Sequence, residues 1–337
     1  MTTTIDLGDE YVLNNCTKYL ARDSGAVAES WRFPIIDSYS DGKDFVGSYA
    51  CNAVTFVFAT PPNEAAPGSV AAVSTCGSLF EPIPMPRIGD SPYYAVTVVV
   101  PKAQVHTYKF LVDGKPRLDP VNPQQVVLDN GRTWSRFFTH LCSQPISFED
   151  WELDLLQRLI DCILPFRTDA GQNFLQRFVD SLSKTDQETQ YVHAYRLDEP
   201  VGVVNFIDKL VAKEEHHRLV DYKLCLRQIN SVLRQRDVRE PVDMPDPMYI
   251  DLYNQMASDN VPGWDTNAYG SPSFFLKLLR RHTFTGAFAH PKYGGNQGAA
   301  GWGYLEERYL NPTTGETLFN WRRLMEQPLG DSADYHG

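Results

Sequence analysis

Three histidines are the residues of this chain best suited to metal chemistry. His282 and His290 follow each other closely, and His216 lies further back in the run "EEHH". Imidazole nitrogens are common zinc ligands, so His216, His282 and His290 together would indicate a metal-dependent enzyme. However, the chain contains no H-x-x-x-H spacing, and adjacent histidines on a helix point about 100° apart. The pattern favours solvated or hydrogen-bonding histidines and leaves the metal site as the weaker hypothesis.

The stretch 289–304, "AHPKYGGNQGAAGWGY", could serve a second kind of chemistry, because glycine-rich loops can cradle phosphate. Its glycines do not form G-x-G-x-x-G, no strand-then-helix context surrounds them, and no Lys-Ser/Thr pair follows. The chain also lacks a G-x-S-x-G elbow and any C-x-x-C pair, and its 42 acidic residues single out no acid–base pair. The sequence therefore predicts no catalytic, cofactor-binding or metal-binding residue in this chain.

The shape of the same stretch is its other possible use. Glycines in "PKYGGN" allow positive φ and a close approach of the backbone to another surface. Phe288, Tyr293, Trp302 and Tyr304 surround this turn. Aromatic anchors with little charge are typical of the core of a protein interface. A loop packed over its own helices has the same composition, so the residues alone leave both interpretations open.

Two blocks of elements must position these residues. From about residue 51 to 141, short β-branched or aromatic runs alternate with turn formers, which predicts an antiparallel β-sandwich. After residue 147 the period changes to that of helices, and residues 148 to about 286 are expected to be helical. We predict an α+β chain with an N-terminal arm (1–45), an immunoglobulin-like sandwich (46–143), an all-α domain (147–325) and a C-terminal tail (326–337).

Helix signals define the start of the second block. Trp151, Leu155, Leu159 and Cys162 fall on one helical face. Ser147, with Asp150 three residues later, resembles a capping box and predicts the first helix start. Later in the block, "SPSFF" places a good cap before a proline at the first helical position. The run "VVNFIDKLVAKEEHHRLV" continues the helical spacing.

Composition limits the setting in which the chain works. A net charge of -11 and a pI near 5.2 disfavour binding to nucleic acid or to an anionic lipid surface. No run approaches the roughly 20 apolar residues of a membrane span, and the N-terminus lacks the pattern of a secretory signal. We therefore expect a cytoplasmic protein whose six scattered cysteines are free thiols.

The sandwich block resembles the glycogen-binding modules of AMP-activated kinase β subunits and starch-branching enzymes. The likeness rests on a "YKF-VDG" hairpin and a "DP" turn within "HTYKFLVDGKPRLDPVNP". Family modules hold glucan on two tryptophans, but here Phe80 stands at the first position and Pro116 at the second. Phe80, Lys109 and Trp134 remain as candidates for weak carbohydrate contact. The resemblance thus implies the fold more strongly than the ligand, and a carbohydrate-binding protein is the alternative function.

The stretch "GAFAHPKYGGNQGAAGWGYL" resembles the signature of gluconate 2-dehydrogenase subunit 3 proteins, the small subunits of flavin-dependent sugar and alcohol dehydrogenases. The matching residues are Gly286, Phe288, Pro291, Tyr293, Gly294, Gly295, Asn296, Gly301 and Trp302. With the preceding helices, the likeness covers roughly residues 147–310. Composition alone left two interpretations open, a partner interface and a loop packed over its own helices. The resemblance favours the partner interface, formed by Phe288, Pro291, Tyr293, Gly294, Gly295, Asn296 and Trp302.

The second resemblance also implies a partner and its cofactor. Small subunits of this kind associate with a catalytic subunit of the glucose–methanol–choline oxidoreductase type and are required for its maturation. FAD, and an iron–sulfur cluster as an optional further group, would belong to that partner, and an electron-transfer cytochrome is a further candidate partner. Many relatives carry a twin-arginine signal, which this chain lacks. A periplasmic location is therefore expected only if a signal-bearing partner exports the pair.

Overall fold

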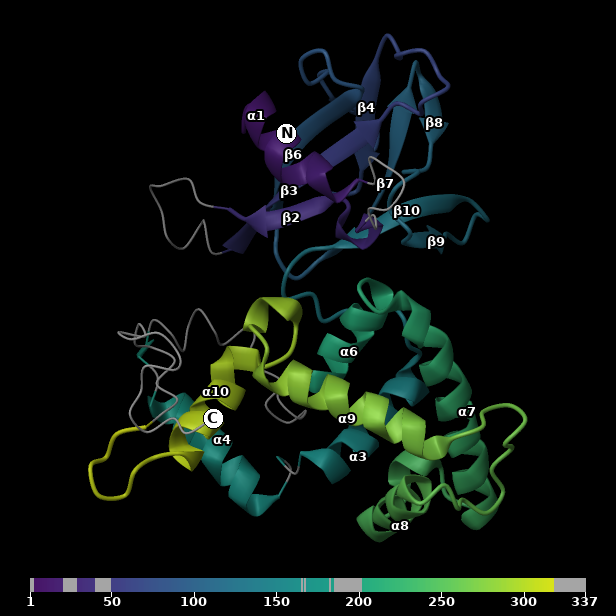
Figure 1. Cartoon of the computed structure of the whole chain (residues 1–337), viewed down its shortest axis with the longest axis vertical. Helices are drawn as coiled ribbons and strands as arrows, with labels where there is room; N and C mark the ends of the chain where they lie inside the picture. Colours follow the sequence, from purple (N-terminus) through teal and green to yellow (C-terminus); the bar gives the residue numbers. More distant parts are fainter. Residues whose placement is uncertain are drawn as a thin grey trace.

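The computed structural model describes residues 3–20, 29–39, 50–164, 166, 168–181, 183–184 and 202–317. Figure 1 shows a β-domain formed by the N-terminal half and a helical domain formed by the C-terminal half. The predicted order, an antiparallel β-sandwich followed by an all-α domain, is confirmed.

Two antiparallel sheets form the sandwich. The first has the order β1-β6-β3-β2, with β1 (Thr4–Ile5), β6 (Tyr93–Pro101), β3 (Cys51–Ala59) and β2 (Ile35–Ser38). The second has the order β5-β4-β7-β10-β9, and β8 also pairs with β7. Its strands are β4 (Val70–Ser74), β5 (Ile83–Pro84), β7 (Val105–Val112), β8 (Lys115–Arg117), β9 (Gln125–Val127) and β10 (Thr133–Phe138).

The segment predicted as an N-terminal arm contributes to the first sheet. Strand β1 pairs with β6 and strand β2 pairs with β3, so the two outer strands of that sheet come from residues 1–45. Short runs without a strong period are hard to assign from sequence. They gain their strand conformation here by hydrogen bonding to the long strands beside them.

Alternating burial along β7 explains why this strand was readable from sequence. Tyr108 and Phe110 are fully buried between the sheets, and the Tyr108 ring packs 5.0 Å from the Phe56 ring. The strand ends in a tight hairpin, where Asp113 has φ 49° and Gly114 has φ 74°. Two successive positive φ angles are those of the turn that Asp-Gly pairs favour.

The predicted bend at Asp119-Pro120 is built around a buried carboxylate. Asp119 accepts hydrogen bonds from the backbone N–H groups of Val121 (2.8 Å) and Asn122 (3.2 Å) and from the Tyr108 hydroxyl (2.6 Å). Burial raises the pKa of the Asp119 carboxyl, although these donors oppose the shift. This carboxylate ties the loop before β9 to the sandwich core.

The helices of the second domain pack around α9 (Pro272–Phe288). Helices α3, α6, α7, α8 and α10 all contact α9, and Figure 1 shows α9 crossing the middle of the domain. Among the described residues, the other α-helices of this domain are α3 (Asp150–Ile163), α4 (Asp169–Ser181), α6 (Val203–Ala212), α7 (Leu219–Arg236), α8 (Asp246–Ala257) and α10 (Ala300–Arg308). At the start of α9, the Ser271 hydroxyl accepts a hydrogen bond from the Phe274 N–H, as the cap signal predicts.

Two helix predictions need correction. The first helix is capped at Glu149 rather than Ser147, because the Glu152 side chain returns to accept from the Glu149 N–H at 2.9 Å. The run 203–220 is not one helix: α6 ends at Ala212 and α7 begins at Leu219. The intervening "KEEHHR" has no apolar residue to continue the buried face of α6, and it forms only a short 3-10 turn at His216–Arg218.

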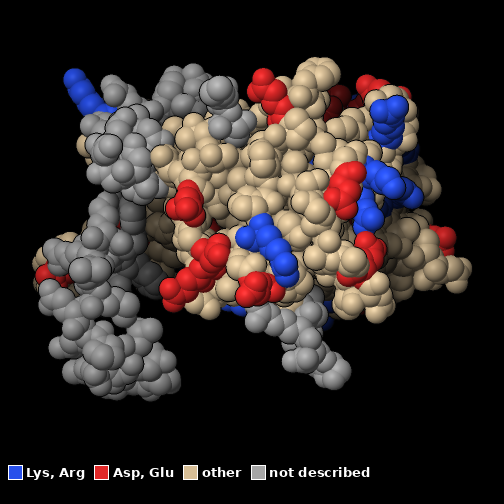
Figure 2. Space-filling view, turned by 90° about the horizontal axis from the view of Figure 1, so that it is seen from above, with Lys and Arg blue, Asp and Glu red and all other residues tan. Residues whose placement is uncertain are grey.

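Contacts join the two domains directly. The Gln124 side chain in the sandwich donates to the Ala212 carbonyl oxygen at 2.6 Å, and Phe138, Cys142 and Ala212 form a small apolar cluster. All six cysteines are free thiols, as expected. On the face viewed in Figure 2, Lys and Arg side chains lie among Asp and Glu side chains. Within the parts of the chain described above, no helix is both long and apolar enough to span a membrane.

Candidate partner-binding site

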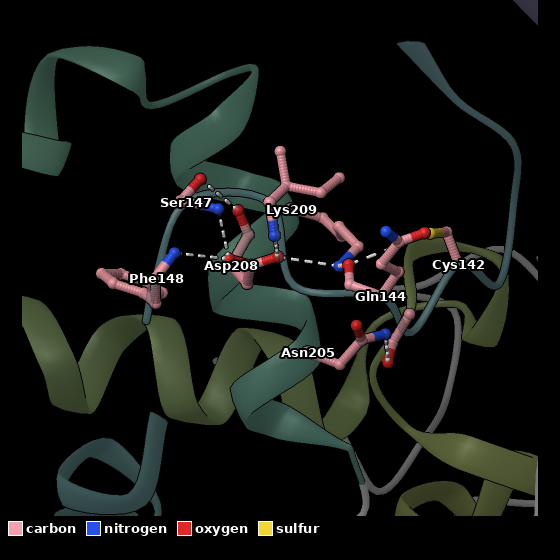
Figure 3. Close-up of polar contacts among 9 residues, drawn as sticks. Cys142, Gln144, Ser147, Phe148, Asn205, Asp208 and Lys209 are labelled. Carbon is pink, nitrogen blue, oxygen red and sulfur yellow. Dashed lines mark hydrogen bonds and ion pairs between the residues drawn. The ribbon is translucent and has the colours of Figure 1, made fainter. Parts of the chain in front are cut away.

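Three buried polar residues on helix α6, Asn205, Asp208 and Lys209, form a polar stripe. This stripe holds the interdomain linker, residues 139–149 between β10 and α3. Asp208 accepts from the backbone N–H groups of Ile146 (2.9 Å), Ser147 (2.7 Å) and Phe148 (3.1 Å), and these bonds converge on one carboxylate. Figure 3 shows the linker running alongside α6 at this point. Ser147, predicted to cap the first helix, instead uses its hydroxyl to donate to the Asp208 carbonyl oxygen at 3.0 Å.

Lys209 completes this clamp. Its Nζ lies 2.8 Å from the Asp208 carboxylate and donates to the Gln144 carbonyl oxygen at 2.6 Å. Both side chains of the pair are almost fully buried. A buried ion pair is retained only when hydrogen bonds satisfy its remaining donors and acceptors, as they do here. We call the Asp208–Lys209 pair and its hydrogen bonds the clamp. The clamp fixes the linker that leaves the sandwich to helix α6 of the helical domain.

The third member of the stripe, Asn205, connects α6 to the glycine-rich turn. Its Nδ2 donates to the Gly294 carbonyl oxygen at 2.8 Å (Figure 3). Gly294 has φ 93°, a left-handed conformation, and a Cβ at this position would lie 2.6 Å from Asn205 Nδ2. Both the φ angle and the close approach require glycine.

Asn296 is the internal brace of the turn. It is fully buried and has φ 45°, a conformation that asparagine tolerates better than most residues. Its Nδ2 donates to the Ala289 carbonyl oxygen at 2.8 Å, and its Oδ1 accepts from the Gly301 N–H at 2.7 Å. One side chain thus joins the end of α9, the turn and the start of α10.

Close backbone packing explains two further glycines of the signature. A Cβ on Gly295 would collide with the Gly286 carbonyl oxygen, and a Cβ on Gly301 would collide with the Ala287 carbonyl oxygen. Gly286 itself faces the Phe206 ring, which a Cβ would approach to 2.7 Å. The turn therefore lies directly on the α9 backbone. The glycine pattern is in the first place a requirement of this packing.

The geometry also argues against phosphate binding by the turn. The Gly294 N–H donates to the Pro291 carbonyl oxygen at 2.9 Å, and the Gly301 N–H is taken by Asn296. A phosphate cradle needs such backbone N–H groups to point at the ligand. The N–H groups of Gly294 and Gly301 are used internally and do not point at a ligand.

The predicted interface residues separate into two groups in the structure. Gly294, Gly295 and Asn296 are buried and shape the turn. Tyr293 is 47% exposed and reaches the surface, while Phe288, Pro291 and Trp302 are partly buried beside it.

Two contacts hold the Trp302 side chain in place. Its Nε1 donates to the Phe288 carbonyl oxygen at 2.7 Å. The His290 ring meets it edge-on at 5.7 Å. Tyr293 is therefore the aromatic side chain of the turn most accessible to a partner, and it stands on a firmly packed support.

The three histidines of the metal hypothesis have separate surroundings. His282 is buried, with Nδ1 2.9 Å from the Tyr222 hydroxyl and Nε2 3.0 Å from Glu215, and burial lowers its pKa. His290 Nδ1 accepts from the Lys292 N–H at 3.1 Å, while His216 begins a short exposed turn. In the described ranges, no three His, Cys, Asp or Glu side chains gather as metal ligands. The structure favours hydrogen-bonding roles for these histidines.

The carbohydrate candidates on the sandwich lie in different surroundings. Trp134 on β10 lies beside Lys109 on β7, and the Lys109 ammonium sits 5.0 Å above the indole ring. Phe80 is 94% exposed in the loop between β4 and β5, so it packs against almost nothing. A sugar needs an open aromatic face, and Lys109 occupies one face of Trp134.

Residues 150–306 match the model of the family "Gluconate 2-dehydrogenase subunit 3". This match supports the assignment of the helical part of the chain to that family. The match begins with α3 and ends within α10, so it includes the clamp on α6, the glycine-rich turn and Trp302. The match to the gluconate 2-dehydrogenase subunit 3 family supports a role as the small subunit of a dehydrogenase complex.

Solved structures show only partial similarity. An enterochelin esterase from Shigella flexneri has 16% identity and a TM-score of 0.26, with 28% of this chain and 32% of that chain covered. A ferric enterobactin esterase from Salmonella typhimurium has 14% identity and a TM-score of 0.28, covering 35% of this chain and 37% of that one. The chain spans about a third of the length of these esterases. A search of curated proteins found no match.

Proposed function

We propose that this chain is the non-catalytic small subunit of an FAD-dependent sugar or alcohol dehydrogenase. Its partner is a catalytic subunit of the glucose–methanol–choline type. The chain assembles with that subunit and supports its stability or maturation. The flavin, and any iron–sulfur cluster, belong to the partner, and an electron-transfer cytochrome is a further candidate member of the complex. We place the complex in the cytoplasm unless the partner carries an export signal.

The single observation that carries this proposal is the packing of the signature turn within a domain of the small-subunit family. Its glycines and Asn296 fix the backbone against α9, and Asn205 ties it to α6. Tyr293 projects from this support and is half exposed. A rigid aromatic anchor loses little conformational entropy when a partner covers it, which is typical of interface hot spots.

The exposed position of Tyr293 defines the test. The chain and a flavoprotein of the stated type are co-expressed, and their dissociation constant is measured with wild-type chain and with Tyr293→Ala. Removal of a hot-spot aromatic costs about 2 kcal/mol or more, so the complex should weaken roughly 30-fold. Phe80→Ala removes an exposed aromatic from the sandwich and should leave the affinity unchanged.

The same variants also define the outcomes that would contradict the proposal. If Tyr293→Ala and Phe80→Ala bind the flavoprotein equally well, the turn is not the docking surface. If the wild-type chain shows no association with such a flavoprotein, the proposed function itself is wrong. Melting temperatures of both variants show whether any loss of binding follows from loss of the fold.

A further inference from the structure

A carboxylate joins the loop between α6 and α7 to helix α9. Residues 213–218 form this loop, which ends in the 3-10 turn η4 (His216–Arg218). The Glu215 carboxylate accepts from Arg281 at 2.6 Å, and its Oε2 lies 3.0 Å from His282 Nε2. Both partners are consecutive residues of α9. Glu215 therefore ties the loop to the helix around which the domain packs.

His282 extends this contact into the core of the helical domain. Its Nδ1 lies 2.9 Å from the Tyr222 hydroxyl on α7. Tyr222 and His282 are buried, whereas the side chain of Glu215 is 25% exposed and that of Arg281 is 56% exposed. We call these four residues the latch. Its hydrogen bonds run from a fully buried hydroxyl to the surface.

One protonation state of His282 satisfies the hydrogen bonds of the latch. In the neutral imidazole with its proton on Nε2, this N–H donates to Glu215, and Nδ1 accepts from the Tyr222 hydroxyl. Among the described residues, the Tyr222 hydroxyl has no other hydrogen-bond partner. The partners on the two sides of the ring therefore select this neutral tautomer.

A second proton on His282 would disrupt this arrangement. Nδ1 would become a donor, so the proton of the Tyr222 hydroxyl would lose its acceptor at a buried position, which is costly. The new positive charge would also lie close to Arg281, whose guanidinium is 2.9 Å from His282 Nε2. Glu215 attracts an imidazolium, but Arg281 already pairs with that carboxylate.

The charged groups that act on His282 come from the loop, from α9 and from η4. Burial lowers the pKa of His282; Glu215 opposes the shift, while Arg281 and Arg218 add to it. Arg218 is itself paired with Asp221 on α7 at 3.3 Å. A solvated imidazole has a pKa of about 6.5. Below that pH a released latch binds more protons than a closed one, so acid favours release.

We propose that the latch is a pH-sensitive switch: neutral His282 keeps the loop 213–218 on α9, and acidification releases the loop. The loop begins where the two domains touch, since the Lys213 ammonium lies 4.5 Å from the centre of the Phe138 ring at the end of β10. Release of the loop therefore loosens the contact between the sandwich and the helical domain. The switch belongs to the chain alone and does not depend on the catalytic partner.

Hydrogen exchange of the full-length chain tests the switch. The backbone N–H groups of Glu215, His216 and Arg218 donate to carbonyl oxygens within or just before the loop. A turn this short is not stable by itself, so these N–H groups stay protected only while the loop is held. Protection factors, which correct for the intrinsic pH dependence of exchange, are compared at pH 7.5 and 5.5. A released imidazole with a pKa of about 6.5 favours opening about 10-fold over this range, so protection should fall about 10-fold. Equal protection at the two pH values overturns the proposal.

Two variants separate His282 from the other titrating groups. Glutamine gains no proton in this range, so His282→Gln should abolish the pH dependence of loop protection. His216 lies exposed in the same loop, and His216→Gln should keep the 10-fold fall. Equal pH dependence in the wild type and both variants would refute the switch.

The wild type provides a measurement that holds even if His282→Gln does not fold. Nitrogen NMR of the imidazole should show His282 neutral, with its proton on Nε2, in the folded chain at both pH values. A doubly protonated His282 in the folded chain at pH 5.5 would overturn the proposal, because the closed latch would then tolerate the charge.

Discussion

The substitution Asp208→Asn tests the clamp between the linker and α6. The wild-type carboxylate accepts from three backbone N–H groups and pairs with Lys209 at 2.8 Å, in surroundings that exclude water. Asparagine keeps the volume and one acceptor oxygen. Its second position becomes an NH₂ donor, which would face either a backbone N–H or the Lys209 ammonium. In either orientation two buried donors lose their acceptor, and the Lys209 ammonium loses its anionic partner.

The expected loss follows from those two groups. A buried donor left without a partner costs about 1–3 kcal/mol, and breaking a buried ion pair costs about 3–5 kcal/mol. The two effects share one side chain and are not additive. We therefore expect Asp208→Asn to lower the free energy of unfolding by about 3–5 kcal/mol.

Urea denaturation of the full-length chain measures this loss, with the same substitution at Asp246 as the control. Asp246 pairs with Arg158 at 2.8 Å, but its side chain is 83% exposed, so Asp246→Asn should cost about 1 kcal/mol or less. Two separate transitions in Asp208→Asn would show that the clamp couples the domains. Equal losses in the two variants would refute the reasoning, because burial would then make no difference to the pair.

Three further predictions follow from the turn, from Lys213 and from the sandwich. Gly301→Ala should lower the free energy of unfolding by about 1–3 kcal/mol because its Cβ meets a backbone carbonyl, whereas Gly270→Ala, whose Cβ would make only an ordinary contact at 3.9 Å, should be nearly neutral in the same denaturation assay. The Lys213 pKa is about 8 when folded and 10.5 in the unfolded reference, so the unfolded chain binds more protons between these values. The unfolding free energy of the wild type should rise relative to Lys213→Gln by at most about 3 kcal/mol from pH 8 to 10.5, and a constant difference would contradict the assigned shift. Maltoheptaose should bind the sandwich weakly or not at all because Lys109 occupies one face of the Trp134 ring, and micromolar affinity measured by tryptophan fluorescence would show an intact platform.

Much of the fold was accessible from sequence because local rules agree with the tertiary structure. The alternation in β7, the Asp113-Gly114 hairpin and the Ser271 cap all depend on residues close together in the chain. The strands β1 and β2 were not assigned, since they are short and acquire their conformation from pairing with β6 and β3. The end of α6 was not predicted, because the helical spacing was extended across the charged residues 213–218. This run contains no apolar residue that could form a buried helix face.

The candidate site was only partly accessible for a related reason. The sequence singled out the glycine-rich turn but could not show that Asn296 is fully buried and serves as an internal brace. The polar stripe Asn205, Asp208 and Lys209 was overlooked, although its i, i+3, i+4 spacing within an apolar helix was a usable signal. Its partners lie about 60 to 90 residues away in sequence, a pairing that no local pattern reveals.

The most direct test of the proposed function is gel filtration with flavin absorbance, performed on the chain alone and after co-expression with a flavoprotein of the glucose–methanol–choline type. The account predicts that the isolated chain elutes without flavin and oxidises no sugar. With the partner, both chains should elute as one yellow complex, and the flavoprotein should lose stability or activity when the small subunit is omitted. Stoichiometric flavin or sugar oxidation by the isolated chain, or a flavoprotein that is fully active and elutes separately, would contradict it.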